Sequence, residues 1–124
     1  MPTDIRIIHA HDFIKATLDG QLDLERAKEA LLEIASASSA LAEYEIILDT
    51  RKAESGMSIF DLWYLALELE KFRKTFSRKT AVLCPLEGFD SAEFFALCAK
   101  NRNLQIRAFT SFEEAIEWLV ANQT

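Results

Sequence analysis

The chain has 124 residues, of which half are hydrophobic and 27% are charged, and its formal net charge is −6. A chain of this length can bury about two-thirds of the surface that its unfolded form exposes, which suffices for one core without disulfides or a structural metal. This composition excludes disordered, collagen-like and low-complexity proteins. The acidic balance argues against a nucleic-acid partner, because phosphate binding needs a cationic face. No repeat or linker interrupts the sequence, so we expect one domain over residues 1–124.

The two cysteines, Cys84 and Cys98, lie in apolar surroundings and form no metal-ligand or redox pair with a neighbouring residue. We therefore expect buried thiols in a reducing compartment. The first residues lack the basic and apolar regions of a signal peptide, and no apolar stretch approaches 18 residues. These features predict a cytoplasmic protein without integral membrane association.

The first half of the chain predicts a hairpin, a helix and a buried strand. Residues 5–9 and 13–18 are short runs with β-branched side chains, and Asp19 and Gly20 close the second run. Asp23 can cap a helix over residues 24–37, whose apolar residues recur on one face. Residues 45–49 carry a compact apolar run, Ile46 to Leu48, between Glu45 and Asp49, which indicates a central strand covered on both faces.

The second half alternates helices and strands. Residues 50–57 form a predicted polar loop, after which Ser58 and Asp61 resemble a capping box at the start of a long helix ending near Phe76. Pro85 closes a strand over residues 80–84. The remaining elements are a helix capped by Asp90 or Ser91 and ending at Lys100, a strand over residues 105–109, and a last helix opened by the capping box of Ser111 and Glu114.

The expected order is β-β-α-β-α-β-α-β-α. Alternating strands and helices imply right-handed crossovers and an α/β fold. We therefore predict a mixed, mostly parallel five-stranded sheet with helices packed on it, in which the opening hairpin supplies one antiparallel strand.

This pattern resembles the STAS superfamily, and within it the SpoIIAA-like group. The resemblance covers nearly the whole chain in element order and depends on three segments: residues 47–49, residues 81–83 and residues 106–119. The last segment is the most specific, since it joins a strand, a capping box and the spacing of Ala115, Trp118 and Leu119. The resemblance implies the fold of the anti-sigma-factor antagonists and of the cytoplasmic domains of sulfate transporters, and a relationship to the lipid-binding SEC14 or CRAL-TRIO fold.

The same resemblance implies a phosphoacceptor. In the antagonists, a partner kinase modifies a serine that precedes a glycine in the loop after the third strand. Ser55, followed by Gly56, matches that position, although Glu54 and Met57 depart from the usual neighbours.

The loop itself has the features of an anion site. It follows a central strand and precedes a helix N-terminus, where backbone N–H groups and the helix dipole favour negative charge. The candidate phosphoacceptor and anion-loop residues are Asp49, Arg51, Lys52, Ser55, Gly56 and Ser58. The alternative is an ordinary connection in which Gly56 relieves strain and Ser58 caps the helix.

The long helix predicted after this loop has more apolar residues than one buried face requires. One stripe spans its whole length and should face the sheet: Leu62, Leu65, Ala66, Leu69, Phe72 and Phe76. A second cluster occupies an adjoining sector of the first turns: Ile59, Phe60, Trp63, Tyr64 and Leu67. We expect this cluster to contact a partner or a hydrophobic ligand, because contiguous exposed apolar patches mark interaction sites. The alternative is burial by another part of the same chain.

Other features carry weaker signals. Residues 71–80 hold five cations and no acid, either as C-terminal complements to the helix dipole or as a surface for an anionic partner. His9 and His11 share a strand face, but no third metal ligand can be named. No nucleophile motif, phosphate-binding glycine loop or paired catalytic base occurs, so we expect no enzyme, no metal and no cofactor.

Two functions remain. The first is a non-catalytic STAS-like interaction and regulatory module that acts through protein contacts, with a homodimer through the Trp63 face. The second is a SEC14-like binder of a hydrophobic or lipid ligand, with its site lined by Phe60, Trp63, Tyr64 and Leu67.

Overall fold

The computed structural model describes residues 4–10, 13–38 and 45–121. In chain order its strands and helices are β1 (Asp4–Ala10), β2 (Phe13–Leu22), α1 (Leu24–Ser38), β3 (Glu45–Ser55), α2 (Ile59–Leu69), β4 (Thr80–Leu83), α3 (Phe89–Lys100), β5 (Ile106–Phe109) and α4 (Phe112–Val120). Short 3-10 turns follow α2 (Glu70–Phe72) and precede α3 (Leu86–Gly88). The predicted α/β class and the predicted order of elements are confirmed.

The sheet follows the chain, with strand order β1-β2-β3-β4-β5. β1 runs antiparallel to β2, from Asp4 opposite Asp19 to Ala10 opposite Phe13, so the predicted hairpin is confirmed. The pairs β2–β3, β3–β4 and β4–β5 are all parallel. The sheet is therefore mostly parallel, with the antiparallel strand at one edge.

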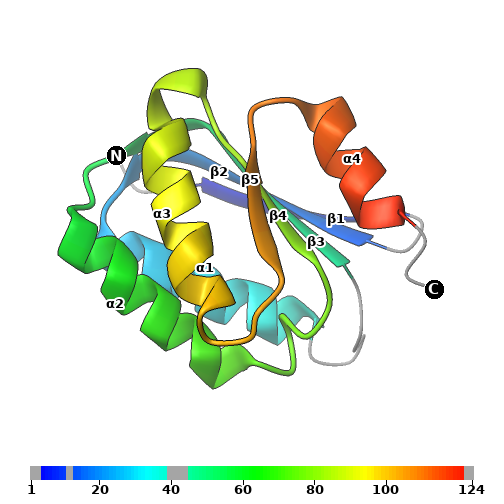
Figure 1. The fold of residues 1–124 in the computed structure, drawn as a ribbon, viewed down its shortest axis with the longest axis horizontal. Coiled ribbons are helices and arrows are strands. Elements are labelled where there is room, and N and C mark those ends of the chain that lie inside the picture. The colour runs from blue at the N-terminus through cyan, green and yellow to red at the C-terminus, as the bar shows by residue number, and fades with distance from the viewer. Residues whose placement is uncertain (1–3, 11–12, 39–44, 122–124) are drawn as a thin grey trace.

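Helices cover the two faces of this sheet unequally. Successive parallel strands are neighbours and crossovers share one hand, so the connecting helices fall on the same face. Within the described residues, α1, α2 and α3 lie together on one side of the sheet and α4 lies on the other (Figure 1). Ile46 and Leu48 enter the larger core with α1–α3, and Ile47 enters the smaller core with α4. The prediction that residues 45–49 are covered on both faces is confirmed.

The predicted loop over residues 50–57 is wrong for most of its length. β3 continues to Ser55, and its last residues pair with an extension of β2, from Asp19 opposite Lys52 to Leu22 opposite Ser55. The Gly56 N–H then donates to the Leu22 carbonyl at 3.2 Å. The segment is polar because β3 has lost its other neighbour there: β4 pairs with β3 only as far as Asp49. We call these paired ends of β2 and β3, residues 19–22 and 52–55, the β2–β3 extension.

The predicted end of the first hairpin at Leu18 is also wrong, since Asp19 and Gly20 belong to β2. The pairing of β2 with β3 shifts register between Thr17 and Asp19, and Gly20 has a φ of 89°. A left-handed residue costs glycine nothing, so the strand passes through this irregularity and continues. Gly20 lies just after the irregularity and pairs with Ala53, so it does not end the strand in a turn.

The predicted helix over residues 58–76 is shorter in the structure. α2 ends at Leu69, and the chain tightens into the 3-10 turn of Glu70–Phe72. The guanidinium of Arg73 donates to Glu70 at 3.1 Å and to the carbonyl oxygen of Arg102 at 2.8 Å, which directs the chain toward the end of α3. Phe76 is still buried, as predicted, but from beyond the helix.

Capping follows the sequence at α2, follows it in part at α4, where only the Ser111 half of the predicted box of Ser111 and Glu114 is present, and departs from it at α3. Ser58 and Asp61 form the predicted capping box, with each side chain bonded to the other residue's backbone N–H. Ser111 accepts from the Glu114 N–H at 3.3 Å. α3 begins at Phe89 after Gly88 without a side-chain cap, so the predicted caps Asp90 and Ser91 lie inside its first turn.

Candidate functional site

α2 separates its apolar residues onto two sides. Leu62, Leu65, Ala66 and Leu69 are buried as predicted. Four residues of the predicted second cluster stay exposed: Ile59 at 66%, Phe60 at 82%, Trp63 at 47% and Tyr64 at 38%. We call these four residues the α2 face. Leu67, predicted with them, is half-buried.

Two cations, one on α1 and one just after α3, lie over the aromatic rings of the α2 face. The Lys28 Nζ of α1 lies 5.3 Å from the centre of the Tyr64 ring, and the Arg102 guanidinium carbon, just after α3, lies 5.9 Å from that of Trp63. A cation over an aromatic ring is attracted to its negative face. These contacts restrain both rings while leaving their outer surfaces exposed, so the α2 face is preorganised for contact.

The corner between β3 and α2 places two serines beside the α2 face. Ser58 is engaged in the capping box, whereas Ser55 is exposed at the end of β3 and accepts only a long bond, 3.4 Å, from the Met57 N–H. Among the described residues, no carboxylate or histidine is hydrogen-bonded to the Ser55 hydroxyl. Ser55 therefore has the accessibility of a modification site.

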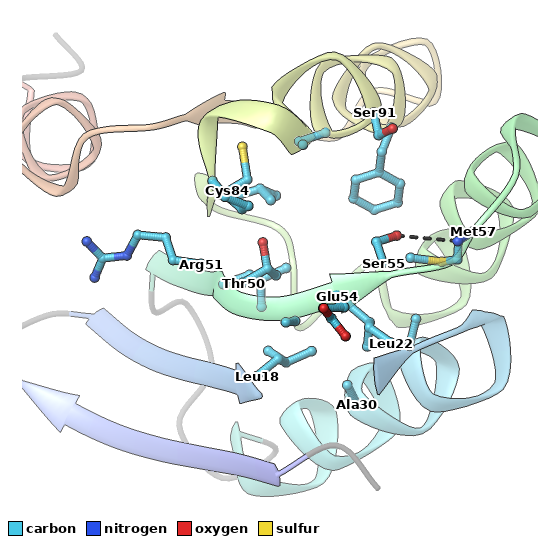
Figure 2. Close-up of a pocket in the computed structure, with 18 of the residues that line it drawn as sticks. Leu18, Leu22, Ala30, Thr50, Arg51, Glu54, Ser55, Met57, Cys84 and Ser91 are labelled. Carbon is cyan, nitrogen blue, oxygen red and sulfur yellow. Dashed lines mark hydrogen bonds between the residues drawn. The ribbon is translucent and has the colours of Figure 1, made fainter. Parts of the chain in front are cut away.

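The six residues of the predicted anion loop do not form one cluster. Arg51 donates to the two carboxylate oxygens of Asp49 at 3.0 and 2.9 Å and, through its backbone N–H, at 3.1 Å, while Lys15 lies 3.7 Å away. The Arg51 side chain points away from Ser55 (Figure 2). Lys52 and Gly56 are exposed. The charge of Arg51 is thus already compensated, and Ser55 stands apart from it.

The environment of Asp49 explains its charge. Burial would raise the pKa of this carboxyl, but the hydrogen bonds from the Arg51 side chain and backbone, with the charges of Arg51 and Lys15, outweigh burial and hold the pKa below its ordinary value. The pKa of Arg51 is raised in turn by its hydrogen bonds to Asp49. This ion pair is a structural anchor at the point where β3 leaves β4.

A pocket of about 520 Å³ lies between the β2–β3 extension, α1, α2 and the start of α3 (Figure 2). Its apolar lining includes Leu22, Ala30, Leu31, Leu62, Leu65 and Phe95. The residues predicted to line a ligand site, Phe60, Trp63, Tyr64 and Leu67, do not line this pocket, whereas Leu62 and Leu65, on another side of the same helix, do. Three residues of the predicted anion loop, Arg51, Lys52 and Ser55, line this pocket. Its apolar lining was not predicted, because each segment contributes only a few of those residues.

Several polar groups of this pocket are bonded within the protein. Thr50 donates from its hydroxyl to the Leu83 carbonyl at 3.0 Å, and Glu54 accepts from Gln21 at 2.7 Å. The Cys84 thiol lies 3.5 Å from the Phe109 carbonyl, and burial raises its pKa. The pocket therefore combines an apolar lining with polar side chains that include Lys52, Glu87 and Ser91.

The basic segment over residues 71–80 is largely paired. Lys71 lies 3.2 Å from Glu68, Arg73 is bonded to Glu70, and Arg78 lies 3.7 Å from Glu45. Lys79 is buried. These contacts support the structural explanation of this segment over an anion-binding surface.

Two remaining expectations can be placed only in part. His11 lies outside the described residues, so the predicted pair of His9 and His11 has no described geometry. In the part of the chain that the structure describes, no helix is both long and apolar enough to cross a membrane.

The strand order and the split of helices between the two faces match the SpoIIAA-like fold. No family model and no curated protein matches the chain.

Several solved structures resemble this chain over most of its length. A protein of the DUF3478 family with a SpoIIAA-like fold, from Shewanella loihica, is 20% identical with a TM-score of 0.60, over 94% of this chain and 93% of that one. An anti-sigma factor antagonist from Mycobacterium paratuberculosis is 12% identical with a TM-score of 0.66, over 96% and 95%. The Bacillus cell fate determinant SpoIIAA in its phosphorylated form is 18% identical with a TM-score of 0.53, over 93% and 98%. At these identities the comparison establishes the fold.

Proposed function

We propose that this protein is a non-catalytic regulatory module that binds a partner protein through the α2 face. The observation that carries this proposal is the exposure of Ile59, Phe60, Trp63 and Tyr64 on the outer side of a helix whose other side is buried. Large apolar patches are uncommon on monomers and mark interaction sites, and tryptophan and tyrosine are enriched among residues that dominate binding energy.

The structural neighbours support a regulatory role. They include anti-sigma factor antagonists, one of them in a phosphorylated form. In this chain Ser55 is exposed, and three residues, Gly56, Met57 and Ser58, connect it to Ile59 of the α2 face. A phosphate there would add about −1.5 to −2 charges beside an apolar docking surface, which would change the affinity of a partner. We include phosphorylation of Ser55 in the proposal.

Binding experiments test the α2 face. Immobilised wild-type protein and the Phe60→Ser and Trp63→Ser variants are exposed to lysate of the source organism, with Val120→Ser as the control. Val120 is exposed at 66% on α4, far along the chain from the α2 face. We expect at least one protein whose purified form binds wild type and the control with the same Kd and binds both α2-face variants at least tenfold more weakly. Equal Kd values for all four proteins would reject the α2 face.

A kinase assay tests the phosphorylation of Ser55. Labelled ATP and the same lysate should phosphorylate wild type and Ser58→Ala, and should leave Ser55→Ala unlabelled. Label that persists in Ser55→Ala, or no label in wild type, would contradict phosphorylation of Ser55. The proposal that the α2 face binds a partner protein would be unaffected. A homodimer through the Trp63 face, which the sequence predicts, remains a prediction; light scattering on Trp63→Ser examines it.

A second function is favoured by the pocket of about 520 Å³. Its apolar lining suits the body of a hydrophobic or lipid ligand. Native mass spectrometry of protein purified gently from its own cells should then show a bound mass. The Ala53→Trp variant, which places a large side chain in the lining, should lose that mass while Val120→Trp keeps it. A clean apo mass for the wild type would contradict ligand binding.

A further inference from the structure

A stripe of exposed residues runs along the outer side of α3. Asp90, Glu93, Leu97 and Lys100 are spaced by three, four and three residues, which places them on one side of the helix. All four are exposed, and Leu97 is exposed at 55%. We call these four residues the α3 ridge. Its first half is acidic, its middle is apolar and its last turn is basic.

The α3 ridge borders a hollow of about 710 Å³ at the edge of the sheet. Trp118 of α4 lies on the opposite side, and Ile106 and Arg107 of β5 contribute between them. Figure 1 shows β5 passing between α3 and α4. The hollow is therefore open along the last strand, and its surface combines apolar groups with charges of both signs.

The backbone of β5 is free on this side. The carbonyl oxygens of Gln105 and Phe109 accept from the backbone N–H groups of Thr80, at the start of β4, and of Cys84, just after it, at 2.8 and 2.9 Å. Alternate residues of a parallel strand bond to opposite neighbours, so the backbone groups of Ile106 and Ala108 point toward the hollow. In the described part of the chain no strand pairs with this edge. Unpaired edges are templates for docking another chain.

The charge pattern of the α3 ridge identifies the occupant. We propose that a second copy of this chain docks here, with the two α3 helices antiparallel about a twofold axis between Ala96 and Leu97. Glu93 and Lys100 are equally far from that point, so each Glu93 faces the Lys100 of the other copy. The two Leu97 side chains meet at the centre, and the free edges of the two β5 strands face each other. A surface that is complementary to itself is what a twofold interface requires.

The α2 face lacks this self-complementarity. Its four residues carry no charge, and the exposed cations Lys71 and Lys74 follow it along the chain. A second copy there would gain no pairing of opposite charges. The dimer through α3 leaves the α2 face of both copies open, so a different protein can bind there.

Charge reversal tests this dimer. We expect wild-type protein to dimerise in sedimentation velocity and light scattering, and Glu93→Lys or Lys100→Glu alone to weaken dimerisation at least tenfold. Each reversal replaces two attractive pairs by two repulsive ones. An equimolar mixture of the two variants should dimerise again, since every facing pair then has opposite charges. The double variant should also dimerise, and added salt should reduce these differences.

Matched controls separate this interface from other surfaces. Lys74→Glu reverses an exposed charge away from the α3 ridge, and Trp63→Ser alters the α2 face; both should leave the dimer intact. Circular dichroism and thermal unfolding establish that each variant is folded. The proposal would be overturned by a monomeric wild type. It would also be overturned if neither the mixture nor the double variant dimerised again, or if Trp63→Ser were the only variant to lose the dimer.

Discussion

The Lys79 ammonium donates a hydrogen bond of 2.7 Å to the carbonyl oxygen of Trp118 and lies 5.2 Å from the centre of the same residue's indole ring. The contact joins the start of β4 to the last turn of α4. A cation at a helix C-terminus complements the helix dipole, and a ring face attracts it as well. Lys79 thereby holds α4 against the sheet. Among the described residues, α4 is the one helix on that face (Figure 1).

Replacing this cation should loosen α4. We expect Lys79→Met, which keeps the aliphatic stem, to lower the free energy of unfolding by about 1–3 kcal/mol, because the charged hydrogen bond and the ring contact are lost. Lys74→Met, at an exposed position, should change it by less than about 0.5 kcal/mol. Urea unfolding measures both. Similar losses in the two variants would show that the Trp118 contact contributes nothing.

Acid should weaken the anchor at Asp49. Its pKa is lower in the folded protein than the unfolded value of about 3.9, so its stabilisation is complete above that value and is lost as pH falls through the folded pKa. We expect Asp49→Asn to cost about 1–3 kcal/mol at pH 7 and much less at pH 2. Urea unfolding across this range, with exposed Glu117→Gln as the control, measures the difference. A cost independent of pH would contradict the assignment.

The capping box of α2 should matter more than the neighbouring serine. Ser58→Ala removes the acceptor for the Asp61 N–H and should cost about 1 kcal/mol in the free energy of unfolding. Ser58→Asp keeps an acceptor and should stay close to wild type, and Ser55→Ala should change little. Thermal and urea unfolding of the three variants provide the comparison. A Ser55→Ala loss as large as that of Ser58→Ala would show that Ser55 has a structural role.

Two glycines should respond differently to alanine. Gly20 has a φ of 89°, a conformation that an L side chain rarely adopts, so Gly20→Ala should cost about 1–2 kcal/mol. A side chain at Gly56 would meet no atom within 4 Å, so Gly56→Ala should be nearly neutral. Equal unfolding midpoints and slopes in urea for the two variants would contradict the strained position of Gly20.

The two thiols should differ in reactivity. Cys84 is buried and its pKa is raised by burial, which reduces the thiolate that reacts, whereas Cys98 is half-buried. In single-thiol variants, Cys98→Ser and Cys84→Ser, iodoacetamide should modify Cys98 faster than Cys84 at pH 8. Mass spectrometry over time gives both rates. Faster modification of Cys84 would mean that the pocket it lines opens readily to solvent.

Periodicity and capping predicted most of the fold. The stripe on α2, the box of Ser58 and Asp61 and the apolar run before Asp49 each depend on neighbours in sequence, and each is present. These signals are local, so a single chain reveals them.

The errors concern partners distant in sequence. Residues 50–55 are polar and have the composition of a loop, yet they are strand because β2 extends to pair with them. The end of α2 depends on Arg73 reaching Arg102, and the pocket depends on several segments meeting. The sequence predicted that the charge of Arg51 would attract an anion, but Arg51 is bonded to Asp49. No pattern within one segment encodes these contacts.

The β2–β3 extension should open locally more readily than the rest of β3. Beyond Asp49, β3 pairs with β2 alone, whereas Ile46 to Asp49 are paired on both sides. Backbone segments with fewer partners open at lower free energy, and amide hydrogen exchange measures that opening. Amides of residues 52–55 should therefore exchange well before those of residues 46–49. Since this extension forms one wall of the apolar pocket, the least protected part of β3 is the part that separates the pocket from solvent.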